Sequence, residues 1–292
     1  MSLITQRFQN IYQLNNHYFE IIGVGSIGSY TTICLAQGGA TKFSLWDDDV
    51  VDAVNIGVQH YNLKDIGISK VKSMRNQILN INPHSRIYSL RKRFDLTGRT
   101  HSAPLQWFGK SKLYHWNIAR PNAFEFDKKN FIICGIDNME GRLQIMTDLF
   151  TKSQGYGTRD TWIIDARMGS ETFQMYTWRL YTDEEIANIL TIQNRLMERN
   201  GDQELAKEIQ EIYYNAGKRF LENYTRTWYS DEEGSSEPCN ARSTNYCGSM
   251  AGAFINNAVR KIADSNSLPN KNLVFNFPSM MLQSEVDYSR MI

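Results

Sequence analysis

The sequence is short of the features that mark secreted and zinc-stabilised proteins. Its 292 residues include only four cysteines, Cys34, Cys134, Cys239 and Cys247. They are too few and too scattered for the disulfide framework of a small secreted protein. The sequence has no Cys-x-x-Cys pair, and its five histidines are dispersed, which argues against a structural zinc.

Charge of one sign and long apolar runs are also scarce. The 32 Lys and Arg residues and 31 Asp and Glu residues give a formal charge of +1, without any run of five or more like charges. Duplex nucleic acid binding requires a dense basic face, so we expect no nucleic-acid partner. The sequence offers neither a signal-peptide stretch nor about 18 consecutive apolar residues. We therefore expect a soluble, cytoplasmic protein without a membrane partner.

What the sequence has instead is an alternation of short apolar strands with helical segments. The first unit is a strand at 19–22, a helix at 26–37 and a strand at 42–46, and further expected strands and helices follow it. They are a helix at 69–79, strands at 86–90, 130–135, 161–165 and 273–277, and a helix at 248–262, with a long connection at 95–129. Continuous apolar strands between helices predict an α/β fold, Rossmann-like and doubly wound, with a mainly parallel sheet and helices on both faces.

One stretch departs from this alternation. Between about Asp183 and Thr227 the apolar residues fall at three- and four-residue steps, which predicts one or two amphipathic helices broken near Asn200-Gly201. We interpret 181–236 as a helical insertion within a single domain that spans 1–292. We expect this insertion to face the substrate or a second copy of the chain.

A glycine-rich loop, Gly23-Val-Gly25-Ser-Ile-Gly28, separates the first strand from the first helix. In such loops the first glycine makes a tight turn, the second lets the backbone approach a phosphate, and the third lets helix and strand touch. The helix N-terminus adds N–H groups for an anion. Asp47, at the end of the next strand, is placed to accept hydrogen bonds from a ribose. These features predict a nucleotide site, which up to this point fits an NAD-dependent dehydrogenase equally well.

The residues after Asp47 separate the two readings. In order, the chain carries Gly-x-Gly-x-x-Gly, Asp-x-Asp-x-Val-x-x-x-Asn-Ile-x-x-Gln, Asp-x-Gly-x-x-Lys, Ile-Asn-Pro and Asp-Asn. Together these motifs resemble the ThiF/MoeB/ubiquitin-activating-enzyme superfamily over about half of the chain. Its members adenylate the C-terminal carboxylate of a ubiquitin-like or sulfur-carrier protein, or of a short peptide. The resemblance implies ATP and Mg²⁺ as cofactors, such a protein or peptide as partner, and a homodimer.

The resemblance also implies roles for single residues. The implied nucleotide contacts are Gly23, Gly25, Gly28, Asp47, Asp49, Asn55, Gln59 and Lys70. Asp137 matches the aspartate that holds magnesium, although it could instead cap the next helix. Because a carboxylate that attacks the α-phosphate meets a polyanion, Lys70, magnesium and the loop N–H groups would offset charge in the transition state. Arg167 could contact the phosphates or the substrate tail, or pair with Asp165 or Glu171.

The chain departs from the family where most members have Arg before the Gln, because Val58 precedes Gln59 here. This removes a guanidinium and leaves either compensation elsewhere or weakened adenylation. Arg7 lies where the family often sends an arginine from one subunit of a dimer into the partner's site. Cys239 follows an acidic loop where the family's catalytic-cysteine region lies, so it is a candidate thioester nucleophile, with a structural cysteine as the alternative.

Three alternatives to an adenylating enzyme stay open on the sequence. An NAD-dependent oxidoreductase would bind NADH and release no pyrophosphate. A non-catalytic ATP-binding adaptor of the same fold would explain Val58. A tRNA-modifying relative would need a basic face, which the charge balance does not supply.

Overall fold

Strands and helices alternate along the described part of the chain. The computed structural model describes residues 14–94, 128–151, 160–169, 171–198, 202–228, 244–265 and 270–286. The main elements are β1 (Tyr18–Ile22), α1 (Ser26–Gln37), β2 (Lys42–Trp46), α2 (Lys70–Ile81), β3 (Arg86–Leu90), β4 (Lys129–Cys134), α3 (Met139–Thr151), β5 (Asp160–Met168), β6 (Thr172–Arg179), α4 (Asp183–Glu198), α5 (Gln203–Thr225), α7 (Asn245–Ser265), β7 (Asn270–Asn276) and β8 (Met281–Val286). Short 3-10 turns at Leu14–Asn16, Ala53–Asn55 and Leu63–Asp65 complete them.

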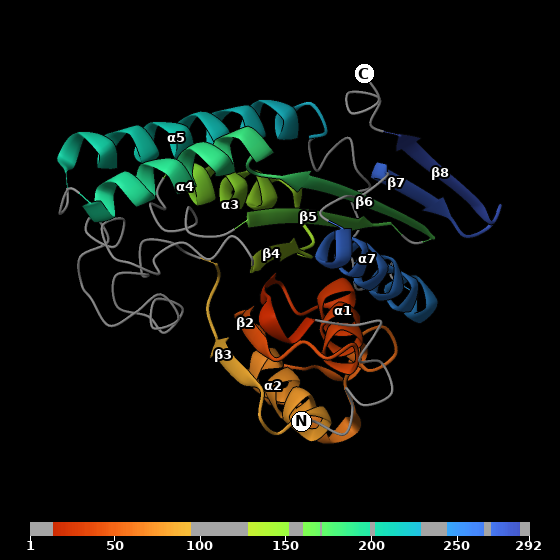
Figure 1. Ribbon diagram of the computed structural model, residues 1–292. Coiled ribbons are helices and arrows are strands. Elements are labelled where there is room, and N and C mark those ends of the chain that lie inside the picture. Colours follow the sequence, from red (N-terminus) through yellow and green to blue (C-terminus); the bar gives the residue numbers. More distant parts are fainter. Residues whose placement is uncertain are drawn as a thin grey trace.

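The strands of the described chain form one sheet in the order β3-β2-β1-β4-β5-β6-β7-β8 (Figure 1). Strands β3 to β5 in this order are parallel, and β6, β7 and β8 join antiparallel. The chain leaves β1 through α1 toward β2 and later returns to place β4 on the other side of β1. In an open α/β sheet this reversal opens a ligand crevice at the carboxyl ends of the strands. The topology therefore places any site at the ends of β1 and β4.

Helices cover both faces of the sheet, as predicted. In β5 the side chain of Ile164 belongs to one buried apolar cluster and that of Ile163 to the other, because successive residues of a strand point to opposite faces. Apolar residues of α1, α2 and α7 complete the first cluster, and those of α3, α4 and α5 complete the second. In Figure 1 the two sets of helices lie on opposite sides of the sheet.

Two strands went unrecognised in the sequence. Strand β6 alternates buried with partly exposed residues, so it lacks the continuous apolar run of β1, β4 and β5. Strand β8 follows β7 at the edge of the sheet, and its Met281 and Leu282 are exposed. The strand expected at 273–277 corresponds to β7, which starts earlier and is not the last one. The connection expected at 95–129 lies outside the described residues except for its last two.

The stretch predicted as helical contains α4 and α5. The break expected near Asn200-Gly201 falls between them, on residues outside the described part. Both helices contribute to the core of one sheet face, so they are a layer of the fold. Helix α7 contacts β5 and β6 as expected, but its Gly248 and Gly252 approach Tyr30 of α1 closely. Within the described residues, the helices are all too short or too polar to cross a membrane.

Candidate functional site

The glycine loop between β1 and α1 has the geometry that its sequence predicts. Gly23 has φ +84°, a left-handed conformation that favours glycine. A Cβ on Gly28 would lie 1.9 Å from the carbonyl oxygen of Gly23, so only glycine allows α1 to approach the strand so closely. A Cβ on Gly25 would meet nothing within 4 Å. Gly25 immediately precedes α1, so the open space lies where the helix offers free N–H groups.

Asp47, at the end of β2, is tied to this loop. Its carboxylate accepts hydrogen bonds from the backbone N–H groups of Val24 (2.8 Å) and Asp49 (2.9 Å). Burial raises the pKa of the Asp47 carboxyl above its usual value, and the charge of nearby Lys70 opposes this shift. The carboxylate is therefore rigidly held beside the glycine loop, where it can accept hydrogen bonds from a ligand.

Lys70 is the first residue of α2 and points back toward β2. Its Nζ donates to Asp49 Oδ2 at 2.7 Å, and its backbone N–H donates to the Asp49 carbonyl at 3.0 Å. The Lys70 side chain is only 8% exposed, whereas that of Asp49 is 64% exposed. This ion pair thus holds a buried ammonium at a fixed position beside an exposed carboxylate.

The turn between β2 and α2 places Asn55 and Gln59 in the same region, and both are buried. The Asn55 side chain accepts from the backbone N–H of Asp52 at 2.8 Å, which fixes the turn. Gln59 Oε1 is buried without a hydrogen-bond partner in the described structure. A buried unpaired acceptor costs free energy, so this amide is suited to a donor from a ligand. Val58 is not among the described residues that line the cavity there, and its carbonyl accepts from Ser26 Oγ at 2.8 Å.

Asp137 lies in the loop after β4 and is exposed. The residue directly before α3 is Asn138, whose Oδ1 accepts from the Gly141 backbone N–H at 2.6 Å, so Asn138 takes the N-cap position that the sequence offered to Asp137. Asp137 presents an exposed carboxylate at the crevice. Such a hard oxygen donor fits Mg²⁺, which proteins usually hold through one or two carboxylates together with substrate phosphates.

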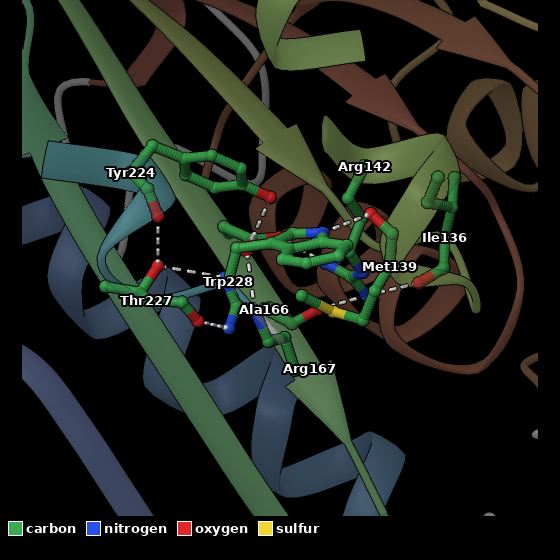
Figure 2. A network of polar contacts seen from close by, with 9 residues as sticks. Ile136, Met139, Arg142, Ala166, Arg167, Tyr224, Thr227 and Trp228 are labelled. Carbon is green, nitrogen blue, oxygen red and sulfur yellow. Dashed lines mark hydrogen bonds and ion pairs between the residues drawn. The ribbon is translucent and has the colours of Figure 1, made fainter. Parts of the chain in front are cut away.

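Arg167, at the end of β5, does not offer a free guanidinium. Its Nε donates to Asp165 Oδ2 at 2.8 Å, and its terminal nitrogens donate to the carbonyl and hydroxyl of Thr227 (Figure 2). Arg142 of α3 binds the other oxygen of the same carboxylate. Of the alternatives raised by the sequence, pairing with Asp165 is confirmed.

These residues meet in one cavity of about 1070 Å³ at the carboxyl edge of the sheet. The predicted residues among its lining are Gly23, Gly25, Asp47, Asp49, Asn55, Gln59, Lys70, Asp137 and Arg167. Gly28 is not part of this lining and supports it from behind, through its contact with Gly23. Arg7 and Cys239 lie outside the described residues. The nucleotide, metal and strand-end residues that the sequence suggested therefore share one compartment.

Two residues that matter here escaped the sequence analysis. Arg142 has the spacing of the buried stripe of α3, with Met146 and Leu149 on the same face. An arginine on an apolar stripe signals a buried partner and could have been noticed. Gln174 of β6 also lines the cavity, and its Oε1 is buried without a partner in the described structure. It was missed because β6 itself was missed.

Comparison with known proteins places this site in a family. A family model described as the ThiF family matches residues 3–287. The chain belongs to the ThiF family. The resemblance noted from the motifs is thus confirmed, and it extends over nearly the whole chain.

Curated relatives match this ThiF-family chain over less than half its length. "Probable adenylyltransferase/sulfurtransferase MoeZ" of Mycobacterium tuberculosis (strain ATCC 25618 / H37Rv) is 37% identical over 132 residues, 44% of this chain and 28% of MoeZ. "Ubiquitin-like modifier-activating enzyme 5" of Xenopus laevis is 24% identical over 139 residues, 48% of this chain and 32% of the relative. "tRNA threonylcarbamoyladenosine dehydratase" of Bacillus subtilis (strain 168) is 35% identical over 79 residues, 27% of this chain and 31% of the relative. The chain thus spans about a third of the length of these relatives.

Solved structures match over more of the chain. The crystal structure of selenomethionine PaaA has a TM-score of 0.56 at 16% identity and covers 96% of this chain and 75% of PaaA. Escherichia coli MccB solved with MccA-N7isoASN has a TM-score of 0.55 at 13% identity and covers 94% of this chain and 64% of MccB. At such low identity this likeness shows a shared fold.

Proposed function

We propose that this chain binds Mg-ATP in the cavity and adenylates the C-terminal carboxylate of a ubiquitin-like or sulfur-carrier protein, or of a peptide. The observation that carries the proposal is the meeting of Asp47, Lys70 and Asp137 in one cavity around the open face of Gly25. Family membership supports it, and so do the relatives named as adenylyltransferase or activating enzyme.

We assign each part of the nucleotide to different residues of the cavity. The ribose would lie on Asp47, whose carboxylate is already oriented by two backbone N–H groups. The phosphates would lie over Gly25 at the start of α1, with Lys70 offsetting their charge. Asp137 would hold Mg²⁺, which neutralises phosphate charge when it is bound. Gln59 Oε1, unpaired in the described structure, is free to accept a ligand donor.

In the proposed reaction an oxygen of the substrate carboxylate attacks the α-phosphorus of ATP. The bond between this phosphorus and the bridging oxygen of the leaving group breaks, and the electron pair leaves with pyrophosphate. The products are an acyl-adenylate and pyrophosphate. Lys70 would contribute by its charge and its fixed position. In a homodimer, Arg7 of the partner subunit would also reach the site.

The acyl substrate would enter from the β5–β6 side of the cavity. There the lining consists of Met168, Gly169, Thr172 and Gln174, beside the fully paired Arg167. One structural neighbour, MccB, was solved with ATP in one crystal and in complex with N-formylated MccA in another. This supports the proposal that a protein of this fold binds a peptide substrate in addition to the nucleotide.

In a proposed second step the Cys239 thiolate, having lost its proton to solvent, attacks the carbonyl carbon of the acyl-adenylate; the bond to the phosphate oxygen breaks, AMP leaves with the electron pair, and a thioester remains. Burial raises the pKa of the thiols at Cys34, Cys134 and Cys247, to about 11 for Cys134 and about 12 for Cys247. These thiols are therefore poor nucleophiles near neutral pH. Alkylation with iodoacetamide at pH 8 should label Cys239 first, and peptide mass mapping would show it. Equal labelling of Cys134 would contradict this assignment.

ATP–pyrophosphate exchange with candidate carboxyl-terminal peptides tests the main proposal. Lys70→Ala and Asp137→Ala should each lower exchange by about 10²–10³-fold, because each removes a group that offsets transition-state charge. Lys72→Ala is the matched control, since Lys72 is an exposed lysine on the same helix and should have no effect. ATP binding without exchange for any peptide would favour the adaptor alternative. Binding of NADH in place of ATP would overturn the proposal.

A further inference from the structure

The loop that carries Asp137 is held from both sides by side chains that belong to other segments. Before Asp137, the carbonyl of Ile136 accepts a hydrogen bond from Arg142. After it, the carbonyl of Met139 accepts from Trp228 Nε1 at 3.2 Å. Figure 2 shows both side chains reaching this loop. Asp137 is exposed, and these two donors hold the backbone on either side of it.

Arg142 is in turn fixed by strand β5. Its guanidinium binds the Asp165 carboxylate and donates to the Ala166 carbonyl at 2.8 Å. The Asp165 carboxylate also accepts from Arg167 Nε at 2.8 Å and from the Tyr224 hydroxyl at 3.3 Å. It is fully buried, so its charge depends on these donors. The contact to Ile136 is therefore the outer end of a closed, buried network.

The end of α5 and the turn that follows it supply the other end of this network. Arg167 donates to the Thr227 carbonyl at 2.6 Å and to its hydroxyl at 3.1 Å, and that hydroxyl donates to the Tyr224 carbonyl at 2.8 Å. Trp228 follows directly and reaches α3. Tyr224, Thr227 and Trp228 thus link the end of α5 to both β5 and the Asp137 loop, across 59 to 89 residues of sequence.

We propose that the turn directly after α5 positions the Asp137 loop, with Trp228 as a positioning residue that acts through the backbone of Met139. This proposal rests on the proposed function only for its effect on catalysis. Since a displacement of about 1 Å in a reacting group can cost about 10²-fold in rate, holding this loop has a direct consequence for a metal-bearing carboxylate. The end of α5 is thereby coupled to the proposed nucleotide site without contacting the ligand.

Hydrogen exchange on the ligand-free chain tests the positioning directly. Trp228→Phe keeps most of the ring and removes the Nε1 donor. The amides of Gly141 and Arg142, which bond to Asn138, report on the loop. We expect them to exchange about 5-fold faster in Trp228→Phe, the change that corresponds to one hydrogen bond of about 1 kcal/mol. Trp178→Phe is the matched control, because Trp178 packs on Phe220 and Tyr224 of α5.

A functional arm uses ATP–pyrophosphate exchange as a function of Mg²⁺ concentration. Trp228→Phe should raise the Mg²⁺ concentration for half-maximal exchange several-fold and leave ATP binding without metal unchanged. Trp178→Phe should change neither. Faster amide exchange throughout the molecule, or no change at Gly141 and Arg142, would overturn the positioning role. A wild-type chain without pyrophosphate exchange would instead refute the proposed function and leave the amide-exchange arm to decide this one.

Discussion

Two groups of charged side chains meet at the cavity, and they are built in opposite ways. At the ends of β2 and β3, Asp48 and Asp49 are exposed and pair with Arg93 and Lys70. At the end of β5, Asp165 is fully buried and is shared by Arg142 and Arg167. The first group faces open space on one side, so a ligand can compete for its charges. In the second group the charged side chains bind one another and the backbone, so they stabilise the fold.

A charge near a crevice is not by itself a ligand-binding charge. Arg142 and Arg167 line the same cavity as Lys70, yet their donors are used by Asp165, by backbone carbonyls and by Thr227. The Asp165 charge raises the pKa of Arg142 despite its burial, which keeps the Arg142 guanidinium protonated. Substitutions should therefore separate the two groups, with stability changes at β5 and ligand-binding changes at β2.

The largest expected effect is on Asp165. Asp165→Asn would leave Arg142 and Arg167 buried without a counter-charge, and this should lower the free energy of unfolding by about 3–5 kcal/mol. Urea denaturation followed by far-UV circular dichroism measures the change. Asp49→Asn, at an exposed ion pair, should cost less than about 1 kcal/mol and instead weaken ATP binding. Equal destabilisation by the two substitutions would remove the distinction between the groups.

Within the glycine loop, substitutions at Gly28 and Gly25 should likewise separate an effect on stability from an effect on ligand binding. Gly28→Ala forces a Cβ to within 1.9 Å of the Gly23 carbonyl oxygen, so the loop must move, at a cost of about 1–3 kcal/mol. Gly25→Ala meets nothing in the protein and should change stability by less than about 0.5 kcal/mol. It should nevertheless weaken ATP binding in isothermal titration, since the new methyl group enters the cavity. Normal ATP affinity in Gly25→Ala would show that the phosphates do not approach this position.

The adjacent residues Asn138 and Asp137 should show the same contrast between fold stability and ligand binding. Asn138→Ala removes the cap of α3 and should destabilise the chain by about 1 kcal/mol. Asp137→Ala removes an exposed carboxylate and should change the unfolding free energy by less than about 0.5 kcal/mol, while it abolishes the Mg²⁺ dependence of ATP binding. Thermal and urea unfolding of the two variants side by side decide this. A larger stability loss in Asp137→Ala would mean that Asp137 supports the fold.

The exposed group could be predicted from sequence, and the buried one could not. Asp47, Asp49 and Lys70 lie within one short stretch that starts at the end of the second strand, and the family resemblance of its motifs implied their roles together. Asp165, Arg142 and Tyr224 come from β5, α3 and α5, and only tertiary folding brings them together. The sequence raised an Arg167–Asp165 pair because the two residues are neighbours on one strand.

The same reasoning explains the strands. Strands β1, β4 and β5 are buried on both faces and contain continuous apolar runs, whereas β2 alternates and was recognised from its place after the glycine loop and the first helix. Strand β6 alternates and β8 is an exposed edge, so neither gave that signal. Gln174 was therefore invisible as a cavity residue. The glycine loop and the family motifs pointed to the side of the crevice proposed for the nucleotide, whereas the side proposed for the acyl substrate lies on the antiparallel strand β6.

The smallest expected effect is at Arg93, which pairs with Asp48 at 3.0 Å while its side chain is 89% exposed. An ion pair in contact with water contributes about 0–1 kcal/mol and weakens with salt. Arg93→Ala should therefore shift the urea midpoint no more than the neighbouring control Arg91→Ala, which replaces another exposed arginine. Because Arg93 lines the cavity, ATP titrations at low and at 0.5 M salt should show a larger loss for Arg93→Ala than for Arg91→Ala only at low salt. A stability loss above about 2 kcal/mol would mean that Arg93 stabilises the fold as the Asp165 group does, and the distinction between the two groups would be wrong.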